Sequence, residues 1–259
     1  MTLELIAEIG STCAGSLDNA LALISAAHGA GATGVKFQAF QPDRLAARRA
    51  KHPRIEPAMA AAGYPSIGGI FIESPLIDIY REIHMPREWF PPMIARAMDL
   101  GLTWHSSVFD PDDVAFLETL DCPRYKISSF EANESDIRDA IIDTGKPHIV
   151  SVNQNEGVWP PRLKDTVLHA TDYAIQPKQA NLARLQRWAH TDARPSWGLS
   201  DHTNSNIAAE IATALGARMI EWHLKLTNVK TPDDAFAHIP LQLLFKVNRV
   251  RLIQEALNG

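Results

Sequence analysis

Residues 196–224 read SWGLSDHTNSNIAAEIATALGARMIEWHL and contain one complete strand–helix–strand unit. Short apolar runs of strand type occupy residues 196–200 and 218–224, and apolar residues at three- and four-residue spacing mark a helix between them. The helical pattern stops at Gly216, a residue type that commonly ends helices. Strands joined by a helix pair in parallel, so this stretch predicts a parallel sheet with helices packed outside it.

The same alternation of strands and helices runs along most of the chain. We expect eight strands, at residues 4–9, 33–40, 102–107, 124–128, 148–152, 166–171, 196–200 and 218–224. Helical patterns lie between most of them, and residues 240–259 supply a final helix. Eight such units predict an α/β fold of the (β/α)8 TIM-barrel type, and the chain has the usual length of one barrel. A doubly wound open sheet is the alternative architecture.

Composition limits the class of protein. The chain has 259 residues, 46% of them hydrophobic and 21% charged, with a formal net charge of −5. Intermixed charges of this balance give no basic face for nucleic acid. No apolar run approaches the ~20 residues of a membrane span, and the N-terminus lacks a signal-peptide pattern. Two cysteines make no disulfide framework. We therefore expect a single cytoplasmic domain, 1–259, with small-molecule substrates and no nucleic-acid or membrane partner.

Two segments depart from a regular barrel. Residues 41–85 form a long insertion after the second strand, and loops of that length in compact domains are usually functional. Between the fifth and sixth strands there is only NQNEGVWPPRLKD, in which Pro160 and Pro161 leave room for one helical turn or none. We therefore expect a shortened or missing fifth helix.

Polar residues gather where the strands end, which is where a TIM barrel builds its active site. Lysines and hydroxyls meeting there suit a phosphate, and histidines on two neighbouring strands suit a divalent metal ion. Each residue alone has an ordinary structural explanation, such as a snorkelling lysine or a helix-capping serine. As a set they predict a metal- and phosphate-using barrel enzyme. The set is Glu8, Lys36, Gln38, Ser106, Ser107, Lys126, Ser129, Glu131, Ser151, Asn153, Asp172, Ser200, Asp201, His202 and His223.

Several motifs occur in one order along the chain: AEIG (7–10), GAGATGVKFQ (29–38), SSVFD (106–110), YKISSFE (125–131), TGKPHIVS (144–151), GLSDHT (198–203), IEWH (220–223) and PDDAF (232–236). Together they make the chain resemble the sialic acid synthase family, the N-acetylneuraminate synthase-like barrels that use phosphoenolpyruvate. The resemblance covers nearly the whole chain. GLSDHT and the pair VKFQ and YKIS are its most specific parts.

The resemblance implies a metal-dependent condensation of phosphoenolpyruvate with a sugar or sugar-like aldehyde, which gives a 2-keto-3-deoxy acid and phosphate. It implies that Lys36 and Lys126 hold the anionic donor. It also implies that His202 and His223 bind the metal cofactor, Mn²⁺ first and Mg²⁺ or Co²⁺ as alternatives, with Glu8 orienting the second histidine. The implied catalytic residues are Glu8, Lys36, Lys126, Glu131 and Asp172, and the implied substrate-binding residues are Gln38, Ser107, Ser129, Ser151, Ser200 and Asp233.

Departures from the family pattern concern the acceptor half of the site. Cys13 lies where the family's first loop has histidine, and Asp172 and Ala174 replace an asparagine and a tyrosine. The chain stops at Gly259, so we expect no C-terminal antifreeze-like domain, which in the family supplies an arginine to the partner subunit's site. We therefore expect an acceptor other than N-acetylmannosamine, and a possible homodimer formed through another surface.

Alternatives remain open at this level. Cys13 is either a third metal ligand or a small residue filling space. Arginines of the insertion (Arg44, Arg48, Arg49 and Arg54) either meet a phosphorylated or acidic acceptor or are simply solvated. Asp172 as a general base would fit a lyase, an aldolase or a hydrolase using the same metal site. A non-catalytic, metabolite-binding member of the family is the last alternative.

Overall fold

A computed structural model describes residues 3–49, 76–153, 165–173, 175–190 and 196–258. Eight parallel strands close into a barrel in which each strand pairs with the next along the chain and β8 pairs with β1. Every observed strand overlaps a predicted one, so the predicted TIM barrel is confirmed. The strands are β1 (Glu4–Glu8), β2 (Gly34–Ala39), β3 (Thr103–Val108), β4 (Tyr125–Ile127), β5 (His148–Asn153), β6 (Thr166–Ala170), β7 (Trp197–Asp201) and β8 (Met219–His223).

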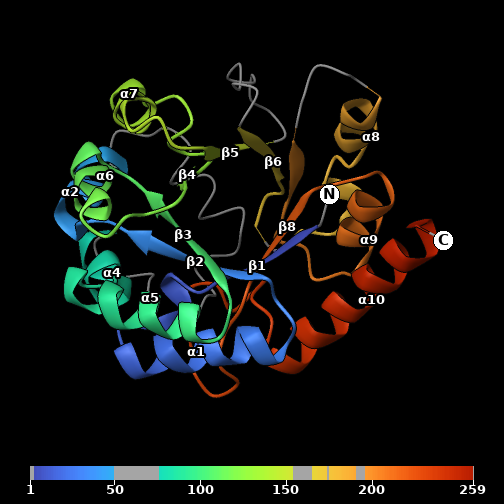
Figure 1. Ribbon diagram of the computed structural model, residues 1–259, viewed down its shortest axis with the longest axis horizontal. Coiled ribbons are helices and arrows are strands. Elements are labelled where there is room, and N and C mark those ends of the chain that lie inside the picture. The colour runs from blue at the N-terminus through green and yellow to red at the C-terminus, as the bar shows by residue number, and fades with distance from the viewer. Residues whose placement is uncertain (1–2, 50–75, 154–164, 174, 191–195, 259) are drawn as a thin grey trace.

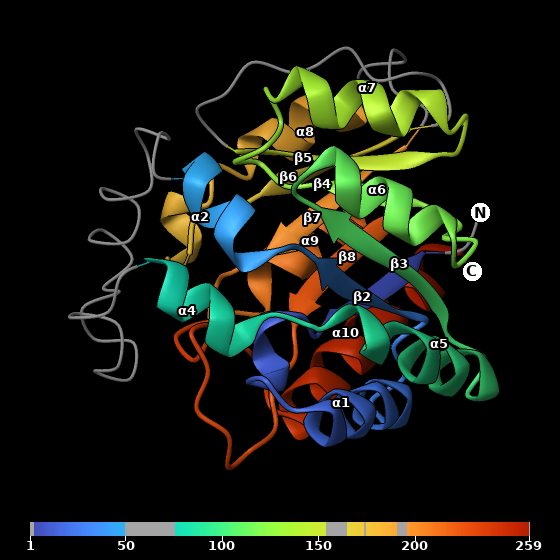
Figure 2. The same cartoon turned by 90° about the vertical axis from the view of Figure 1, so that its left-hand side faces the viewer.

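Helices cover the outside of the barrel (Figures 1 and 2). Several begin with the capping residue that the sequence supplies: the Ser16 hydroxyl accepts the N–H of Asn19, and the Asp110 carboxylate accepts that of Asp112. The helices are α1 (Leu17–Gly29), α2 (Pro42–Arg49), α4 (Leu76–Ile83), α5 (Phe90–Asp99), α6 (Pro111–Glu118), α7 (Ser135–Asp143), α8 (Ala183–Ala189), α9 (Ile207–Ala214) and α10 (Pro240–Asn258), with short 3₁₀ turns at η1 (Ser11–Cys13), η3 (Arg87–Trp89) and η4 (Pro177–Gln179).

Strand alternation decides which side chains reach the barrel interior, because successive residues of a strand point to opposite faces. Four apolar side chains from β1, β5, β6 and β8 pack together as a small cluster: Ile6, Ile149, Leu168 and Met219. Two residues further along β1 and β8 are Glu8 and Glu221, both buried. The alternation therefore places charged side chains in the layer next to this apolar cluster.

Close strand packing also requires a residue without a side chain on β7. A Cβ atom added to Gly198 would lie 2.1 Å from the carbonyl oxygen of Met219, its neighbour on β8. A methyl group cannot be accommodated against backbone at that distance. Gly198 is thus needed for β7 and β8 to approach each other below the carboxyl ends of the strands.

Described parts of the predicted insertion form α2 and α4, which pack against each other beyond β2 (Figure 2). Residues 50–75, the segment 154–164 where we expected a shortened fifth helix, and Ala174 lie outside the described residues. Among the helices that the structure does describe, none has both the length and the apolar character needed to cross a membrane.

Candidate active site

Two lysines share one carboxylate inside the barrel. Lys36 on β2 and Lys126 on β4 both donate to Oε1 of Glu221 on β8, Lys36 at 3.1 Å, and the Ser200 hydroxyl donates to the same oxygen at 2.9 Å. Lys36 also lies 2.9 Å from Oε2 of Glu8. All four charged groups are buried, so each depends on the others for its charge.

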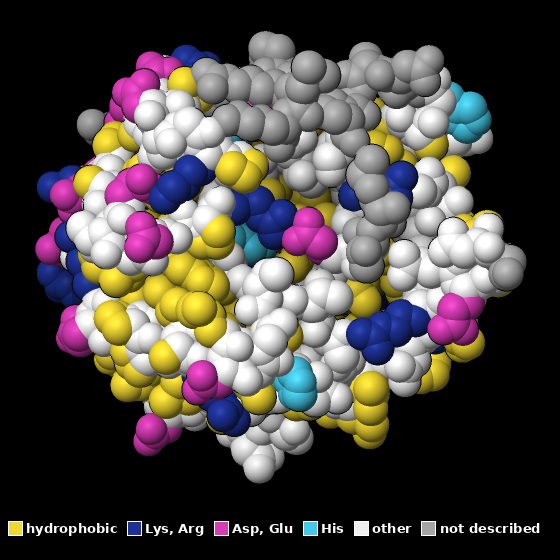
Figure 3. All heavy atoms as spheres, in the orientation of Figure 1, with side chains coloured by type: hydrophobic (Ala, Val, Ile, Leu, Met, Phe, Trp, Pro, Cys, Tyr) yellow, Lys and Arg dark blue, Asp and Glu magenta, His cyan; other side chains and the backbone are white. Residues whose placement is uncertain are grey.

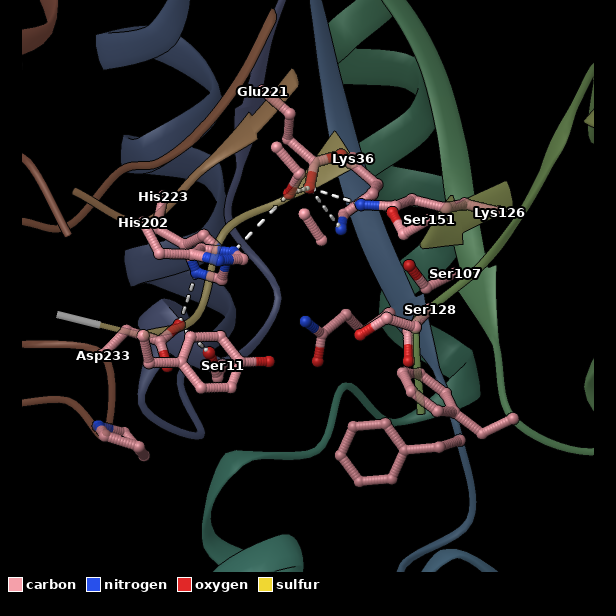
Figure 4. Close-up of a pocket in the computed structure, with 18 of the residues that line it drawn as sticks. Ser11, Lys36, Ser107, Lys126, Ser128, Ser151, His202, Glu221, His223 and Asp233 are labelled. Atoms are coloured by element: carbon pink, nitrogen blue, oxygen red, sulfur yellow. Dashed lines mark hydrogen bonds and ion pairs between the residues drawn. The ribbon is translucent and has the colours of Figure 1, made fainter. Parts of the chain in front are cut away.

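Proton affinities within this cluster follow from that arrangement. Burial opposes the charge of Lys36, but Glu221 and Glu8 outweigh it and raise the pKa of its ammonium group. At Lys126 the attraction of Glu221 does not fully offset the effect of burial, so the pKa of its ammonium group is lowered. Burial likewise opposes the charge of Glu221, yet the two ammonium groups hold its pKa well below the ordinary value. A cationic pair centred on one carboxylate results, with Ser107 and Ser151 beside it (Figure 4).

Two histidines lie side by side on the other part of the pocket, with ring centroids 5.2 Å apart (Figure 4). Nδ1 of His202 is 2.6 Å from the carbonyl oxygen of Thr171, and Nδ1 of His223 is 2.7 Å from Oδ2 of Asp233. A carbonyl and a carboxylate only accept hydrogen bonds, so both Nδ1 atoms carry the proton and both Nε2 atoms keep a lone pair. Burial and the neighbouring His223 lower the pKa of His202 to about 3, so this imidazole stays neutral.

This donor set fits a divalent metal ion. Neutral imidazoles with free Nε2 atoms are common metal ligands, and a carboxylate on the other nitrogen is the usual way to fix such a ring. No group of three or more His, Cys, Asp or Glu side chains suited to a metal occurs within the part of the chain that the structure describes. Two histidines would therefore hold the ion, and oxygen atoms of water or substrate would complete its coordination.

Ten of the thirteen predicted site residues line one pocket together: Lys36, Gln38, Ser107, Lys126, Ser129, Ser151, Ser200, His202, His223 and Asp233. Within it, the hydroxyl of Ser151 and Oε2 of Glu221 are buried and have no hydrogen-bond partner among the described residues. Buried polar atoms are rarely left without a partner, so atoms of this kind mark where a ligand would bind.

Glu8 has a different role from the one implied by the resemblance. Its Oε1 accepts the backbone N–H of Gly10 at 2.7 Å and the Gln38 amide at 2.8 Å, while its Oε2 faces Lys36. Asp233, which we expected to face the acceptor, is the carboxylate that orients His223. Register alone does not decide between the two partners, since Glu8 is directly paired both with Lys36 on β2 and with His223 on β8; its side chain contacts Lys36.

Glu131 and Asp172 are not among the described residues that line the pocket. Arg49 and Ser128 do line the pocket. Glu131 lies behind them and accepts a hydrogen bond from each. Asp172 accepts a hydrogen bond from the Asn153 amide at 2.6 Å. The place we expected Asp172 to take is filled instead by its neighbour Tyr173, whose ring lies 4.6 Å from that of His202.

Arginines of the insertion divide into two groups. Arg44 and Arg48 are paired with Asp110, which caps α6, and Arg48 also with Asp136 in the first turn of α7, so their charges hold α2 in place. Neither lines the pocket, whereas Arg49 does. Arg54 lies outside the described residues.

Cys13 fits the space-filling interpretation. Its side chain is fully buried, and burial raises the pKa of its thiol to about 11. Cys13 is also not among the described residues that line the pocket with His202 and His223, so it is not placed to be a third metal ligand.

Sequence reasoning missed Glu221, Tyr173, Ser11 and Ser128, and it named Arg49 only as one of four arginines of the insertion. Glu221 had a usable signal, because it stands two residues before His223 on the same strand and therefore points the same way. The others had none, since they reach the pocket from loops and from the insertion.

Fold and site together define a TIM-barrel protein with a buried lysine pair and two neighbouring histidines, of a kind suited to a metal ion, at the carboxyl ends of its strands. Residues 23–157 and 162–259 match the NeuB family. The chain belongs to this family, which confirms the resemblance to sialic acid synthases.

Individual relatives agree along almost the full chain. It is 31% identical to the pseudaminic acid synthase of Campylobacter jejuni, over 98% of this chain and 74% of the relative. It is 25% identical to the N-acetylneuraminate-9-phosphate synthase of Mus musculus, over 98% of this chain and 71% of that one. A crystal structure of N-acetylneuraminic acid synthetase from Leptospira borgpetersenii, in complex with citrate, has the same fold, with a TM-score of 0.81, 19% identity, and coverage of 100% of this chain and 86% of that one.

Proposed function

We propose that the protein condenses phosphoenolpyruvate with a sugar or sugar-like aldehyde to form a sialic-acid-like 2-keto-3-deoxy acid. The observation that carries this proposal is the meeting, in one pocket, of a buried lysine pair with two histidines held in the metal-binding tautomer. Relatives named as synthases of pseudaminic acid and N-acetylneuraminate 9-phosphate support the same reaction.

In the proposed reaction, C3 of phosphoenolpyruvate forms a bond to the aldehyde carbon, and the aldehyde oxygen becomes a hydroxyl. Water adds at C2, the C2–O bond breaks, and inorganic phosphate leaves with the bonding electrons. Lys36 and Lys126 bind the phosphate and carboxylate of the donor as point charges. Ser107, Ser151 and Ser200 line the same region and donate hydrogen bonds to its oxygens.

His202 and His223 would hold the metal ion. When bound, it supplies Lewis-acid chemistry by polarising the carbonyl group of the acceptor. The chain's own contribution there is to orient both imidazoles so that Nε2 of each is left for the ion. Thr171 does this for His202, and Asp233 does it for His223.

Phosphate release from phosphoenolpyruvate tests the proposal. The protein is assayed with Mn²⁺ and a panel of aldoses, N-acetylated amino sugars and their phosphates, and the keto acid is identified by mass spectrometry. Lys36→Ala should abolish release. Lys146→Ala is the matched control, because Lys146 pairs with Glu118 outside the pocket.

Release that depends on one aldehyde and is lost only in the Lys36 variant would support the synthase reaction and name its acceptor. Failure of phosphoenolpyruvate to bind, measured by calorimetry with Mn²⁺ present, would contradict it. Lyase, aldolase or hydrolase chemistry through Asp172 has no comparable support, because Asp172 does not line the pocket.

A further inference from the structure

Helix α2 places its arginines on two sides. Arg44 lies 2.7 Å from Asp110, and Arg48 contacts Asp110 and Asp136 at 3.0 and 2.5 Å. These ion pairs join the insertion to the starts of α6 and α7. Because both cations already have carboxylate partners outside the pocket, they are not available to a substrate.

Arg49, one position further along, faces the pocket. Its Nε donates to Oε1 of Glu131 at 3.0 Å, and its Nη1 donates to the Tyr80 hydroxyl at 3.2 Å. Its guanidinium carbon lies 5.1 Å from the ring centroid of Phe130 and 5.4 Å from that of Phe109. Aromatic rings and one buried carboxylate thus hold the guanidinium in a fixed orientation.

Arg49 belongs to the outer wall of the pocket, away from the lysine pair. Lys36 and Lys126 project from mid-strand positions, whereas Arg49 and its contacts come from α2, α4 and the loops after β3 and β4. The neighbouring lining is apolar, with Phe40, Leu45, Tyr80 and Phe109 packed as one cluster. Near the centre of the face seen in Figure 3, basic and acidic side chains likewise adjoin hydrophobic surface.

Each cation that lines the described part of the pocket faces a carboxylate, but the pairs differ in geometry. Lys36 and Lys126 share Oε1 of Glu221, and each ammonium group is a point charge that can bind an anionic donor as well. Nε and Nη2 of Arg49 both donate to Glu131, so a second phosphate at the outer wall would find this side of the guanidinium occupied and would lie near the Glu131 carboxylate. The remaining Arg49 N–H groups suit a neutral oxygen, such as a hydroxyl or an amide carbonyl.

We propose that the Arg49–Glu131 pair makes this enzyme select uncharged aldehyde acceptors over phosphorylated or carboxylated ones. Arg49 contacts the end of the acceptor remote from the aldehyde, and Glu131 is a positioning residue that acts through Arg49 and Ser128. The inference rests on the proposed function and adds the class of acceptor. Relatives named for both phosphorylated and unphosphorylated products occur in the family, so membership alone does not fix this class.

The test is a selectivity ratio, defined as kcat/KM for an uncharged aldehyde divided by kcat/KM for its terminal phosphate. We expect a ratio above one for the wild type. Glu131→Gln leaves the Arg49 charge unbalanced and should lower the ratio about tenfold, because close charges interact strongly in a partly buried site. Arg49→Gln leaves the negative charge of Glu131 without its partner and should raise the selectivity ratio. Arg44→Gln, on the same helix but outside the pocket, should leave it unchanged.

Binding of the corresponding alditols and alditol phosphates is measured in parallel by calorimetry, with inorganic phosphate occupying the lysine pair. This binding measurement needs no turnover, so it tests Arg49 even if no acceptor supports phosphate release. Absence of phosphate release would count against the proposed function and not against the role of Arg49. A wild type that favours the phosphorylated ligand would overturn the inference. So would a ratio that neither the Glu131 variant nor the Arg49 variant changes.

Discussion

Asp233 and His223 form a hydrogen bond of 2.7 Å that fixes the tautomer of the histidine. The carboxylate also accepts a hydrogen bond from the Ser11 hydroxyl, so η1 and the loop after β8 both position it. Burial opposes the charge of Asp233, but the hydrogen bonds that it accepts from His223 and Ser11 hold its pKa below the ordinary value. Asp233 therefore remains an acceptor, and Nε2 of His223 remains available to a metal ion.

Asp233→Asn should weaken Mn²⁺ binding by about 10- to 100-fold, because an amide can present its N–H₂ to Nδ1 and release the ring from the required tautomer. Calorimetric titration of the purified protein with Mn²⁺ measures this directly. Asp234→Asn is the matched control, since Asp234 binds Lys225 and Thr231 instead. Equal loss of affinity in the two variants would mean that only loop structure is involved.

Glu221→Gln should lower the free energy of unfolding by about 3–5 kcal/mol, because it leaves two buried ammonium groups without their shared carboxylate. Urea denaturation of both proteins gives the difference. Glu210→Gln removes a carboxylate that pairs with the exposed Arg249, so it should cost much less than Glu221→Gln.

Inorganic phosphate should recover part of the loss in the Glu221 variant, since an anion that binds only the folded state stabilises it. A variant that unfolds at the wild-type urea concentration, with or without phosphate, would show that Glu221 does not balance the lysines.

The barrel could be predicted because each of its units repeats the same two periodicities. A strand run, a helical pattern and a Gly stop recur along the chain, and eight of them leave few other architectures. Boundaries shifted by a residue or two, as in β4, which spans only Tyr125–Ile127. Strand ends depend on hydrogen bonds to neighbouring strands, which a local pattern does not contain.

Site residues on strands were predicted better than those on loops. Lys36, Lys126 and His223 project inward because of strand alternation, and that alternation can be read in the sequence. Which carboxylate faces which cation depends on side-chain contacts between strands: Glu8 is paired in register with both Lys36 and His223, and only the structure shows that its side chain contacts Lys36. Arg49 meets Glu131 across 82 residues of chain, and local pattern gives no access to such a contact.

Asp113 should make stability depend on pH. Burial raises its pKa from 3.8 to about 7, even though it accepts a hydrogen bond from the Phe109 backbone. The folded state then binds this proton more tightly than the unfolded state, so stability falls as pH rises from about 4 to 7. Asp113→Asn should therefore raise Tm relative to wild type by about 3 °C or more at pH 8, and by less at pH 5.

Thermal melts at the two pH values measure the Asp113 effect. Asp112→Asn, at a side chain that is 43% exposed and paired with Arg87, is the control. The same Tm difference at pH 5 and pH 8 for the Asp113 variant would exclude this carboxyl group as the cause.

Gly198→Ala should be among the most damaging single-methyl changes in the barrel. The added Cβ would lie 2.1 Å from the Met219 carbonyl oxygen and 2.8 Å from Leu168 Cδ2, and backbone cannot move aside as a flexible side chain can. Overpacking of this kind costs about 1–3 kcal/mol or more. Gly29→Ala, in α1 with nothing within 4 Å of its added Cβ, should instead stabilise the protein by about 0.5–1 kcal/mol. Urea midpoints for the two variants should move in opposite directions, and a shared direction would mean that the β7–β8 spacing is not as tight as the structure shows.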